Sequence, residues 1–256
     1  MTHPLTRQLA GFLLAVQFLT RLPVPVEGLY TAKRYARIPR WFSAVGILIG
    51  LLTAAVFLIA ASVLPPVLAA LIATGAGILI TGCLHEDGLA DLCDGLGSGQ
   101  PKERVLEIMR DSRIGTFGAA GLGLVLACKI VTLGHMPPDT AAACLIAGHC
   151  LSRTACTVVM GLTPYVRSDG KGSGLTTTLS PATIAIMAPF VLFSLLLLLW
   201  FAGPLATVTG LAGLIVGTLI VMRPSQRVLG GHTGDVLGAV QQVSEVTFLL
   251  AVLACL

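Results

Sequence analysis

Residues 41–63, WFSAVGILIGLLTAAVFLIAASV, contain no charged side chain. A helix needs about 20 apolar residues to cross the hydrocarbon core of a bilayer, so this stretch predicts a transmembrane helix. The prediction is an all-α, polytopic integral membrane bundle of about seven or eight spans, forming a single domain over residues 1–256 with the lipid bilayer as its surroundings. The further predicted spans are 66–84, 115–135, 141–161, 181–202, 204–222 and 236–256.

The composition supports this class. Hydrophobic residues make up 55% of the chain and charged residues 11%, whereas soluble domains carry about 25% charged residues. The run Leu9–Thr20 is too short to cross comfortably, so it is either an interfacial or half-embedded helix or part of a longer tilted one. The seven cysteines form no CxxC pair and indicate small buried side chains rather than disulfides or zinc ligands.

Lysine and arginine are distributed unevenly between the loops. The turns near 65, 136–140 and 203 contain none. The positive-inside rule therefore predicts that the basic loops are cytoplasmic. The net charge of +4 is explained by these residues beside the spans, so we expect no nucleic-acid partner. The basic loops are 22–40, 85–114, 162–180 and 223–235.

The loop 85–114 has a second unusual feature, because seven of the twelve acidic residues lie between Glu86 and Asp111. Asp87, Asp91 and Asp94 are spaced i, i+4 and i+7, which puts them on one face of a helix. Adjacent carboxylates repel one another unless a cation lies against them. Mg²⁺ fits, because it takes few protein carboxylates and keeps positions for water or phosphate oxygens.

The next segment, QPKERVLEIMRDSRIG (100–115), predicts a short amphipathic helix on the membrane surface. Its arginines, Arg104, Arg110 and Arg113, are suited to binding phosphate groups. Gly115 and Gly118 then begin a helix whose backbone N–H groups are available to an anion. Carboxylates and guanidinium groups in one loop are typical of a site for a diphosphate ester with Mg²⁺. A solvated loop whose charges pair with one another is the structural alternative.

Polar residues outside this loop are further candidates. The segment RVLGGHTGDVLGA (227–239) offers His232, Thr233 and Asp235, and Asp235 either completes a metal site or caps the following helix. Arg153 either snorkels to the surface or faces the bundle, where it would bind phosphate. Glu245 lies inside the last span, with pairing to Lys129 or Arg153 as the structural alternative.

Two weaker candidates remain. His149 is expected to be a satisfied interhelical histidine. The Gly-rich loop TPYVRSDGKGSG (163–174), with Tyr165, Arg167, Asp169 and Lys171, is either a lid over the site or an ordinary linker.

Four blocks in this order resemble the cobalamin synthase family, the adenosylcobinamide-GDP ribazoletransferases. They are HEDGLADLCDG (85–95), EIMRDSRIGTFG (107–118), LSRTA followed by PYVRSDGKG (151–155 and 164–172), and GGHTGDVLGAVQQVSE (230–245). The resemblance covers nearly the whole chain, including FLTRLPVP (18–25). Three positions depart from the expected pattern: Glu86 replaces an apolar residue, Cys93 a small one, and Arg110 a lysine.

The resemblance implies an Mg²⁺-dependent enzyme of the bacterial inner membrane that completes cobalamin. Such an enzyme joins adenosylcobinamide-GDP to α-ribazole, or to α-ribazole 5′-phosphate, and releases GMP. The metal is then expected on Asp87, Asp91 and Asp94, with His85 or Asp111 as proton acceptor and Asp235 as a further catalytic carboxylate. The expected substrate-binding residues are Arg104, Arg110, Arg113, Arg153 and Thr233, and a homo-oligomer is left open.

Two other functions fit parts of the pattern. A CDP-alcohol-type lipid phosphotransferase also uses an aspartate cluster with Mg²⁺ at the membrane edge, but the compact cluster here matches its motif only partly. A cation-coupled transporter would use Glu245, Arg153 and Lys129 as a relay. Transporters often show repeated halves, and the sequence shows none.

Overall fold

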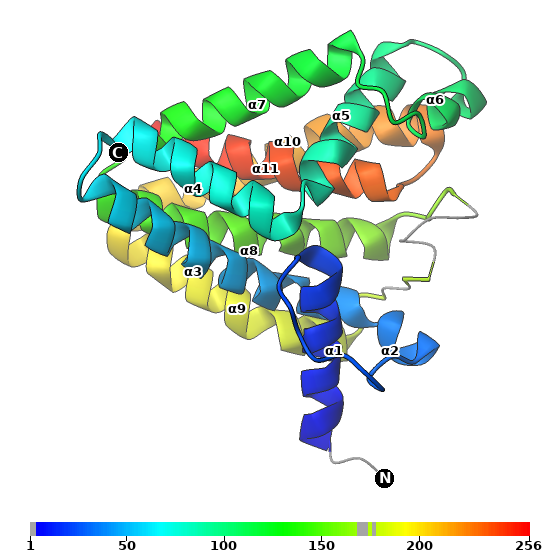
Figure 1. Cartoon of the computed structure of the whole chain (residues 1–256), viewed down its shortest axis with the longest axis horizontal. Helices are drawn as coiled ribbons and strands as arrows, with labels where there is room; N and C mark the ends of the chain where they lie inside the picture. The colour runs from blue at the N-terminus through cyan, green and yellow to red at the C-terminus, as the bar shows by residue number, and fades with distance from the viewer. Residues whose placement is uncertain (1–3, 168–173, 176–177) are drawn as a thin grey trace.

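The computed structural model describes residues 4–167, 174–175 and 178–256, and Figure 1 shows them as a bundle of long helices. An isolated β-bridge between Tyr165 and His232 is the only strand-like pairing in this part of the chain. The helices are α1 (Pro4–Leu19), α2 (Ala32–Tyr35), the 3₁₀ helix η1 (Ile38–Trp41), α3 (Phe42–Ala61), α4 (Pro66–Thr81), α5 (Leu84–Gly97), α6 (Lys102–Ile108), α7 (Thr116–Gly134), α8 (Pro138–Leu162), α9 (Pro181–Phe201), α10 (Gly203–Leu229) and α11 (Gly234–Leu253).

Within the described residues, six helices are long and apolar enough to cross a membrane, and there are seven spans if α4 and α5 count as one bent span. The all-α, multi-pass prediction is therefore confirmed. Six of the seven predicted spans coincide with these six helices, whereas 66–84 coincides with α4, which forms a span only together with α5. The apolar part of α1, Gln8–Leu19, stays below spanning length. Figure 1 shows α1 running across the long helices, and its position relative to the membrane stays a prediction.

The chain turns sharply between α4 and α5. Gly82 and Cys83 both adopt left-handed backbone conformations, with φ of 64° and 61°, and the two helices meet at 91°. A positive φ is uncommon for a residue with a side chain, so Cys83 marks a locally strained turn. The bend directs α5 away from the line of α4. It thereby brings the acidic helix against α11 and α7.

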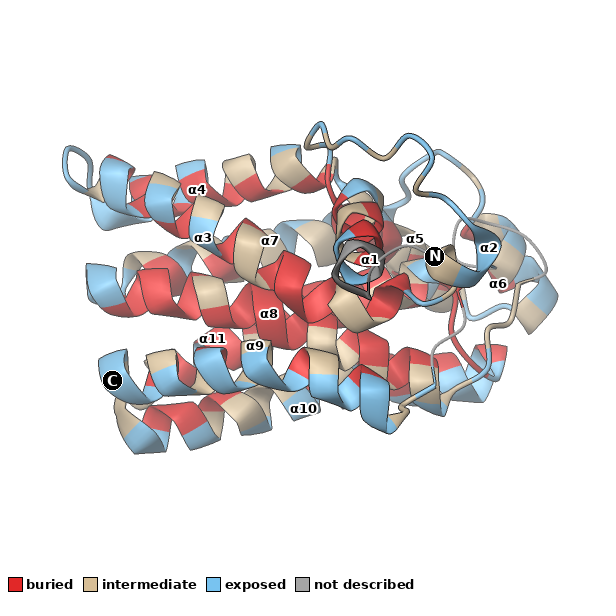
Figure 2. Cartoon of the chain, turned by 90° about the horizontal axis from the view of Figure 1, so that it is seen from below, coloured by how far each residue is buried: buried red, intermediate tan, exposed pale blue. Residues whose placement is uncertain are grey.

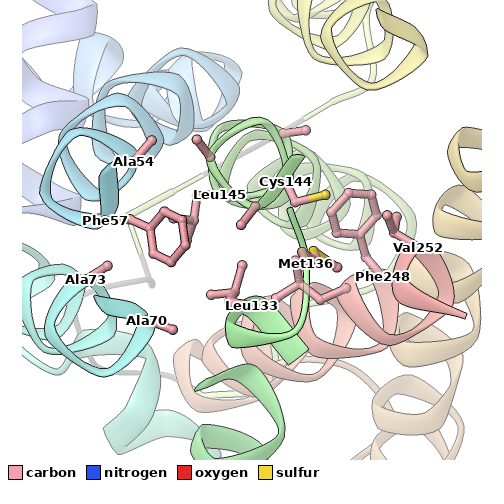
Figure 3. Close-up of a cluster of buried hydrophobic side chains, with 14 of the residues drawn as sticks. Ala54, Phe57, Ala70, Ala73, Leu133, Met136, Cys144, Leu145, Phe248 and Val252 are labelled. Carbon is pink, nitrogen blue, oxygen red and sulfur yellow. The ribbon is translucent and has the colours of Figure 1, made fainter. Parts of the chain in front are cut away.

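Helix α8 occupies the centre of the bundle, as the buried residues in Figure 2 show. Gly46 and Gly50 of α3 bring that helix close to α8, because a Cβ at Gly46 would lie only 2.3 Å from the His149 carbonyl oxygen. Small residues of this kind allow membrane helices to pack at backbone distance. An apolar core between α3, α4, α7, α8 and α11 includes Phe57, Leu133, Leu145 and Phe248 (Figure 3).

The loops divide between the two ends of the bundle. The segments joining α1 to α3, α5 to α7 and α10 to α11, and the residues 163–167 that follow α8, lie toward the right in Figure 1. The short turns after α3, α7 and α9 lie at the left. The described parts of the basic loops identified from the sequence therefore lie toward one end of the molecule.

Helix α5 crosses the start of α11 at a glycine. A Cβ at Gly88 would lie 2.8 Å from the Asp235 Cα and 2.9 Å from its carbonyl oxygen, and one at Gly238 would lie 3.0 Å from the His85 carbonyl oxygen. Real Cβ atoms essentially never approach backbone this closely. This contact fixes the distance between the acidic helix and the last span.

We expect Gly88→Ala to lower the stability of the protein by about 1–3 kcal/mol, because the added methyl group forces α5 away from α11. Gly75→Ala in α4 is the matched control, since a Cβ at Gly75 would have no neighbour within 4 Å. Alanine favours helix by up to about 1 kcal/mol over glycine, so the control should be neutral or stabilising. Thermal unfolding in detergent micelles measures both, and equal melting temperatures would contradict the close contact.

Candidate functional site

The three aspartates lie on α5, as their spacing predicted. Asp87 is exposed, whereas Asp91 and Asp94 are half-buried. The opposite face of the helix is buried through Leu89 and Leu92, which belong to an apolar cluster with α6, α8, α10 and α11. The packing of this apolar face orients the carboxylates.

Asp235 joins this group from the first turn of α11. The Gly88 contact places the two helices together, and Asp91 interacts electrostatically with the negative charges of Asp87, Asp235 and Asp94. Arg167 supplies the positive charge in this environment. Like charges this close repel, so the group favours a bound cation. The sequence-based suggestion that Asp235 belongs with the acidic stretch is consistent with this geometry.

Asp94 has a structural task. One carboxylate oxygen accepts a hydrogen bond from Gly115 N at 2.7 Å, and the other accepts one from Gly118 N at 2.8 Å. The carboxylate therefore caps the N-terminus of α7, where a negative charge stabilises the helix. The sequence predicted an anion at these N–H groups, and in this structure the anion is Asp94 itself. The metal-binding role of Asp94 stays a prediction.

Two loop segments are joined beside Asp235. His232 N donates to the Pro164 carbonyl oxygen at 2.9 Å, and Val166 N donates to the His232 carbonyl oxygen at 3.0 Å. Arg167 then forms an ion pair with Asp235 at 2.8 Å. Its Nε and Nη2 are buried without a hydrogen-bond partner, so the guanidinium group has donors left for a ligand.

The structure gives His232 and Thr233, next to this joint, structural roles. His232 Nδ1 lies 2.8 Å from the Thr163 hydroxyl oxygen, and burial lowers the pKa of His232 to about 4. The imidazole is therefore neutral near pH 7. Thr233 Oγ1 accepts a hydrogen bond from Val236 N, so Thr233 rather than Asp235 caps α11. Asp169 and Lys171 of the suggested lid lie outside the described residues.

A cavity of about 260 Å³ opens between the start of α3, the end of α8 and the starts of α5 and α11. Arg153 lines it and is only 1% exposed, so this arginine faces the bundle interior rather than snorkelling. His85 also lines it and is buried, with Nδ1 lacking a partner. The lining residues used below are Phe18, Phe42, Leu84, His85, Asp87, Arg153, Met160, Arg167, Asp235 and Leu237.

The arginines of α6 and the following loop do not line this cavity. Arg104, Arg110 and Arg113 are exposed, and Arg104 pairs with Glu107 at 2.7 Å. Arg113 pairs with Asp111 at 2.6 Å, and hydrogen bonds from Arg113 lower the pKa of Asp111 to about 2. A carboxylate with so low a pKa is a weak proton acceptor. In this structure the charges of this segment largely pair with one another.

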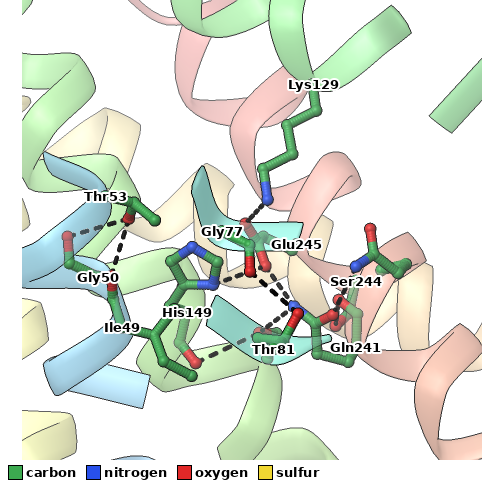
Figure 4. Close-up of polar contacts among 12 residues, drawn as sticks. Ile49, Gly50, Thr53, Gly77, Thr81, Lys129, His149, Gln241, Ser244 and Glu245 are labelled. Atoms are coloured by element: carbon green, nitrogen blue, oxygen red, sulfur yellow. Dashed lines mark hydrogen bonds and ion pairs between the residues drawn. The ribbon is translucent and has the colours of Figure 1, made fainter. Parts of the chain in front are cut away.

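A polar network continues from the cavity into the middle of the bundle (Figure 4). The Glu245 carboxylate is 2.5 Å from Lys129 Nζ and 3.3 Å from His149 Nδ1, and it accepts a hydrogen bond from Gln241. Arg153 Nη1 lies 3.1 Å from His149 Nδ1 and donates to the His149 carbonyl oxygen. Glu245 thus pairs with Lys129, as the structural alternative for this residue predicted. His149 has partners inside the bundle, as was also predicted.

Glu86 enters the same network from α5. It is buried, and Gln242 Nε2 donates to its carboxylate at 2.9 Å. Gln242 in turn donates to the Gln241 side-chain oxygen at 2.9 Å. Glu86, which stands where an apolar residue is expected, therefore has a hydrogen-bond partner in the Gln242 amide of α11.

Together these features define a multi-pass membrane protein with a polar cavity near the loop-bearing end of its bundle. The family model described as cobalamin-5-phosphate synthase matches residues 11–253, so the chain belongs to that family.

Several curated relatives are similar over nearly their whole length. An adenosylcobinamide-GDP ribazoletransferase of Shewanella frigidimarina is 40% identical, covering 97% of this chain and 95% of the relative. An enzyme with the same name from Vibrio cholerae is 37% identical, covering 100% of this chain and 98% of the relative. Another from Bradyrhizobium diazoefficiens is 38% identical, covering 99% of this chain and 96% of the relative. No solved structure matches the chain.

We expect Lys129→Met to destabilise the protein by about 3–5 kcal/mol, because the buried Glu245 carboxylate loses the lysine that balances its charge. The double variant Lys129→Met/Glu245→Gln should recover most of the loss, because it removes both charges. Arg104→Gln is the control, since its exposed ion pair contributes at most about 1 kcal/mol. Unfolding in detergent measures all three, and additive losses in the double variant would contradict the pairing.

Proposed function

We propose that this protein is an adenosylcobinamide-GDP ribazoletransferase that carries out the final step of cobalamin biosynthesis. The observation that carries the proposal is the likeness to enzymes of that name over nearly the full length of both chains. The group formed by Asp87, Asp91 and Asp235 beside Arg167 supports it, because diphosphate chemistry needs metal ligands and guanidinium donors together.

The proposed reaction is a phosphoryl transfer. A free ribose hydroxyl oxygen of α-ribazole, or of α-ribazole 5′-phosphate, attacks the phosphorus atom that bears cobinamide. A new phosphorus–oxygen bond forms, the phosphoanhydride bond breaks, and GMP leaves with the bridging oxygen. With either acceptor, the proton of that hydroxyl must be taken up. We assign that proton to His85, which lines the cavity with an unpartnered Nδ1, because Asp111 lies outside the cavity and is bound by Arg113.

We infer that Mg²⁺ is the cofactor. Among the described residues, no three His, Cys, Asp or Glu side chains are already grouped as a metal site. The donor chemistry nevertheless fits Mg²⁺, which uses one or two carboxylates and completes its shell with water and substrate phosphates. Asp87, Asp91 and Asp235 would hold the ion, with Asp94 contributing if its bonds to α7 allow. When bound, the ion would neutralise charge on the diphosphate and on the departing GMP.

Arg167 is the donor that we assign to phosphate oxygens near the cavity, and Arg153 is assigned to another part of the substrate. Arg167 is already positioned by Asp235, and two of its nitrogen atoms are free of hydrogen bonds. Arg153 retains an unpartnered Nε. The exposed Arg104, Arg110 and Arg113 are proposed to attract the anionic donor before it reaches the site, because a basic rim speeds encounter with an anion.

We propose that the protein lies in the bacterial inner membrane with the loop-bearing end in the cytoplasm. The basic residues gathered at one end of the bundle support this orientation under the positive-inside rule. It also gives the site access to nucleotide-linked substrates in the cytoplasm.

The first test is GMP release by the purified protein in lipid vesicles supplied with adenosylcobinamide-GDP. We expect release only when α-ribazole and Mg²⁺ are both present. Release that is independent of α-ribazole would indicate a hydrolase. A folded protein that releases no GMP under any condition would contradict the proposed function.

Asp91→Asn should lower turnover at least about 100-fold, as expected for loss of a group that stabilises charge in the transition state. Membrane insertion and thermal stability should change little, because asparagine has nearly the same size and removes a charge that its acidic neighbours repel. Asp139→Asn, in the exposed first turn of α8, is the matched control and should retain full turnover. Near-normal turnover in Asp91→Asn would remove Asp91 from the metal site.

A further inference from the structure

The cavity beside the aspartates has an apolar wall. The members of this wall come from α1, α3, α5, α8 and α11, and all belong to a single apolar cluster. Figure 1 shows how the bundle allows this, since α1 crosses the ends of the helices near the loop-bearing end. The wall therefore forms where α1 meets the other helices. Its residues used here are Phe18, Phe42, Leu84, Met160 and Leu237.

Two aromatic rings give this wall a flat surface. The rings of Phe18 and Phe42 are parallel within 5°, with centroids 5.8 Å apart. Offset, parallel rings are a favourable aromatic arrangement. A planar aromatic ligand placed against them would bury its faces without needing hydrogen bonds.

Two buried polar atoms interrupt the apolar wall. His85 and Arg153 both line the cavity, at 6% and 1% exposure, and His85 Nδ1 and Arg153 Nε have no partner. Leaving such groups unpaired is costly, so the cavity favours a ligand that brings a lone pair for Arg153 Nε and a hydroxyl group for His85 Nδ1. Arg153 is held by His149, which fixes the guanidinium group before any ligand arrives.

Three further lining residues are charged. They are Asp87 of α5, Asp235 of α11 and Arg167, which pairs with Asp235, and the diphosphate chemistry is proposed beside them. The cavity thus suits a ligand with an apolar aromatic part and a polar part joined to it. Its volume of about 260 Å³ is close to the lower end of small-molecule sites, about 300 Å³, and far below what a corrin ring requires.

We propose that this cavity is the subsite for the base of the acceptor nucleoside. The inference rests on the proposed function, and it names the part of the substrate that the apolar wall recognises. The base of α-ribazole is a flat dimethylbenzimidazole with one ring nitrogen carrying a free lone pair. One face of the base lies against the wall to which Phe18 and Phe42 contribute, the ring nitrogen accepts a hydrogen bond from Arg153 Nε, and the ribose extends toward His85, Asp87 and Asp235. Guanine, with polar groups around its edge, is a poor match for this wall.

Two variants test the subsite in steady-state assays of GMP release. Phe18→Leu should raise KM for α-ribazole about three- to tenfold, because it removes an aromatic contact. Leu84→Trp should raise it more than about tenfold by filling the cavity. KM for adenosylcobinamide-GDP should change less than about twofold in both, because the donor's diphosphate is proposed to contact Asp87, Asp235 and Arg167 rather than the apolar wall.

The matched controls lie on α9, away from the cavity. Phe193→Leu and Leu199→Trp make the same exchanges at exposed positions and should leave both KM values unchanged. If KM for the donor rises in the cavity variants and KM for α-ribazole does not, the cavity belongs to the donor and the proposal is wrong. The proposal is also wrong if the cavity variants leave both KM values unchanged, as the controls are expected to do.

A binding measurement separates the subsite from the reaction. Calorimetric titration of α-ribazole into the lipid-embedded protein without donor should show binding to the wild type and to Leu199→Trp, and at least about tenfold weaker binding to Leu84→Trp, whose cavity is filled. Wild-type binding without any GMP release in the full assay would leave the subsite standing and overturn the proposed function. GMP release with equal α-ribazole binding by all three proteins would support the proposed function and overturn the subsite.

A series of acceptors tests the apolar character of the wall. The riboside of unsubstituted benzimidazole should show kcat/KM about tenfold below that of α-ribazole, because two buried methyl groups are lost. The difference should shrink in Phe18→Leu and persist in Phe193→Leu. Equal kcat/KM for the two acceptors with the wild type would contradict an apolar base subsite.

Discussion

The contact between Gly88 of α5 and the backbone of Asp235 in α11 is the constraint on which the site depends. A glycine at this crossing lets two helices from distant parts of the sequence approach at backbone distance. The 91° turn after α4 delivers α5 to that position. As a result, Asp87 and Asp91 share an environment with Asp235 and its partner Arg167. Without this approach, the carboxylates would be separate solvated charges.

The site is also tied to the interior of the bundle. Arg153 lines the cavity and contacts His149, which contacts the Glu245–Lys129 ion pair. Ionisable groups inside a membrane protein are costly unless they compensate one another. Here two buried cations lie in one network with the carboxylates of Glu245 and Glu86. The network therefore holds a cationic side chain in place at the back of the cavity.

Part of the site was predictable because it depends on local spacing. The i, i+4, i+7 aspartates needed only helical geometry, and the N–H groups at Gly115 and Gly118 needed only a helix start. The acceptor for those N–H groups was not predictable, because Asp94 is separated from them in the sequence by a long connecting segment. The loop arginines looked like phosphate ligands by residue type, yet Arg113 pairs with Asp111 and Arg167 occupies the position beside Asp235.

The sequence by itself determined the all-helical membrane class, the positions of the spans, the segregation of basic loops and the acidic face of α5. These follow from apolar length, residue spacing and charge counts, which are properties of neighbours along the chain. Only the tertiary structure decided that α1 and α3 build an aromatic wall, that Arg153 faces inward, and that Asp235 joins the acidic helix. Those outcomes depend on the turn at Gly82 and Cys83 and on which glycines permit close packing. Both bring together residues far apart in sequence, which no local pattern specifies.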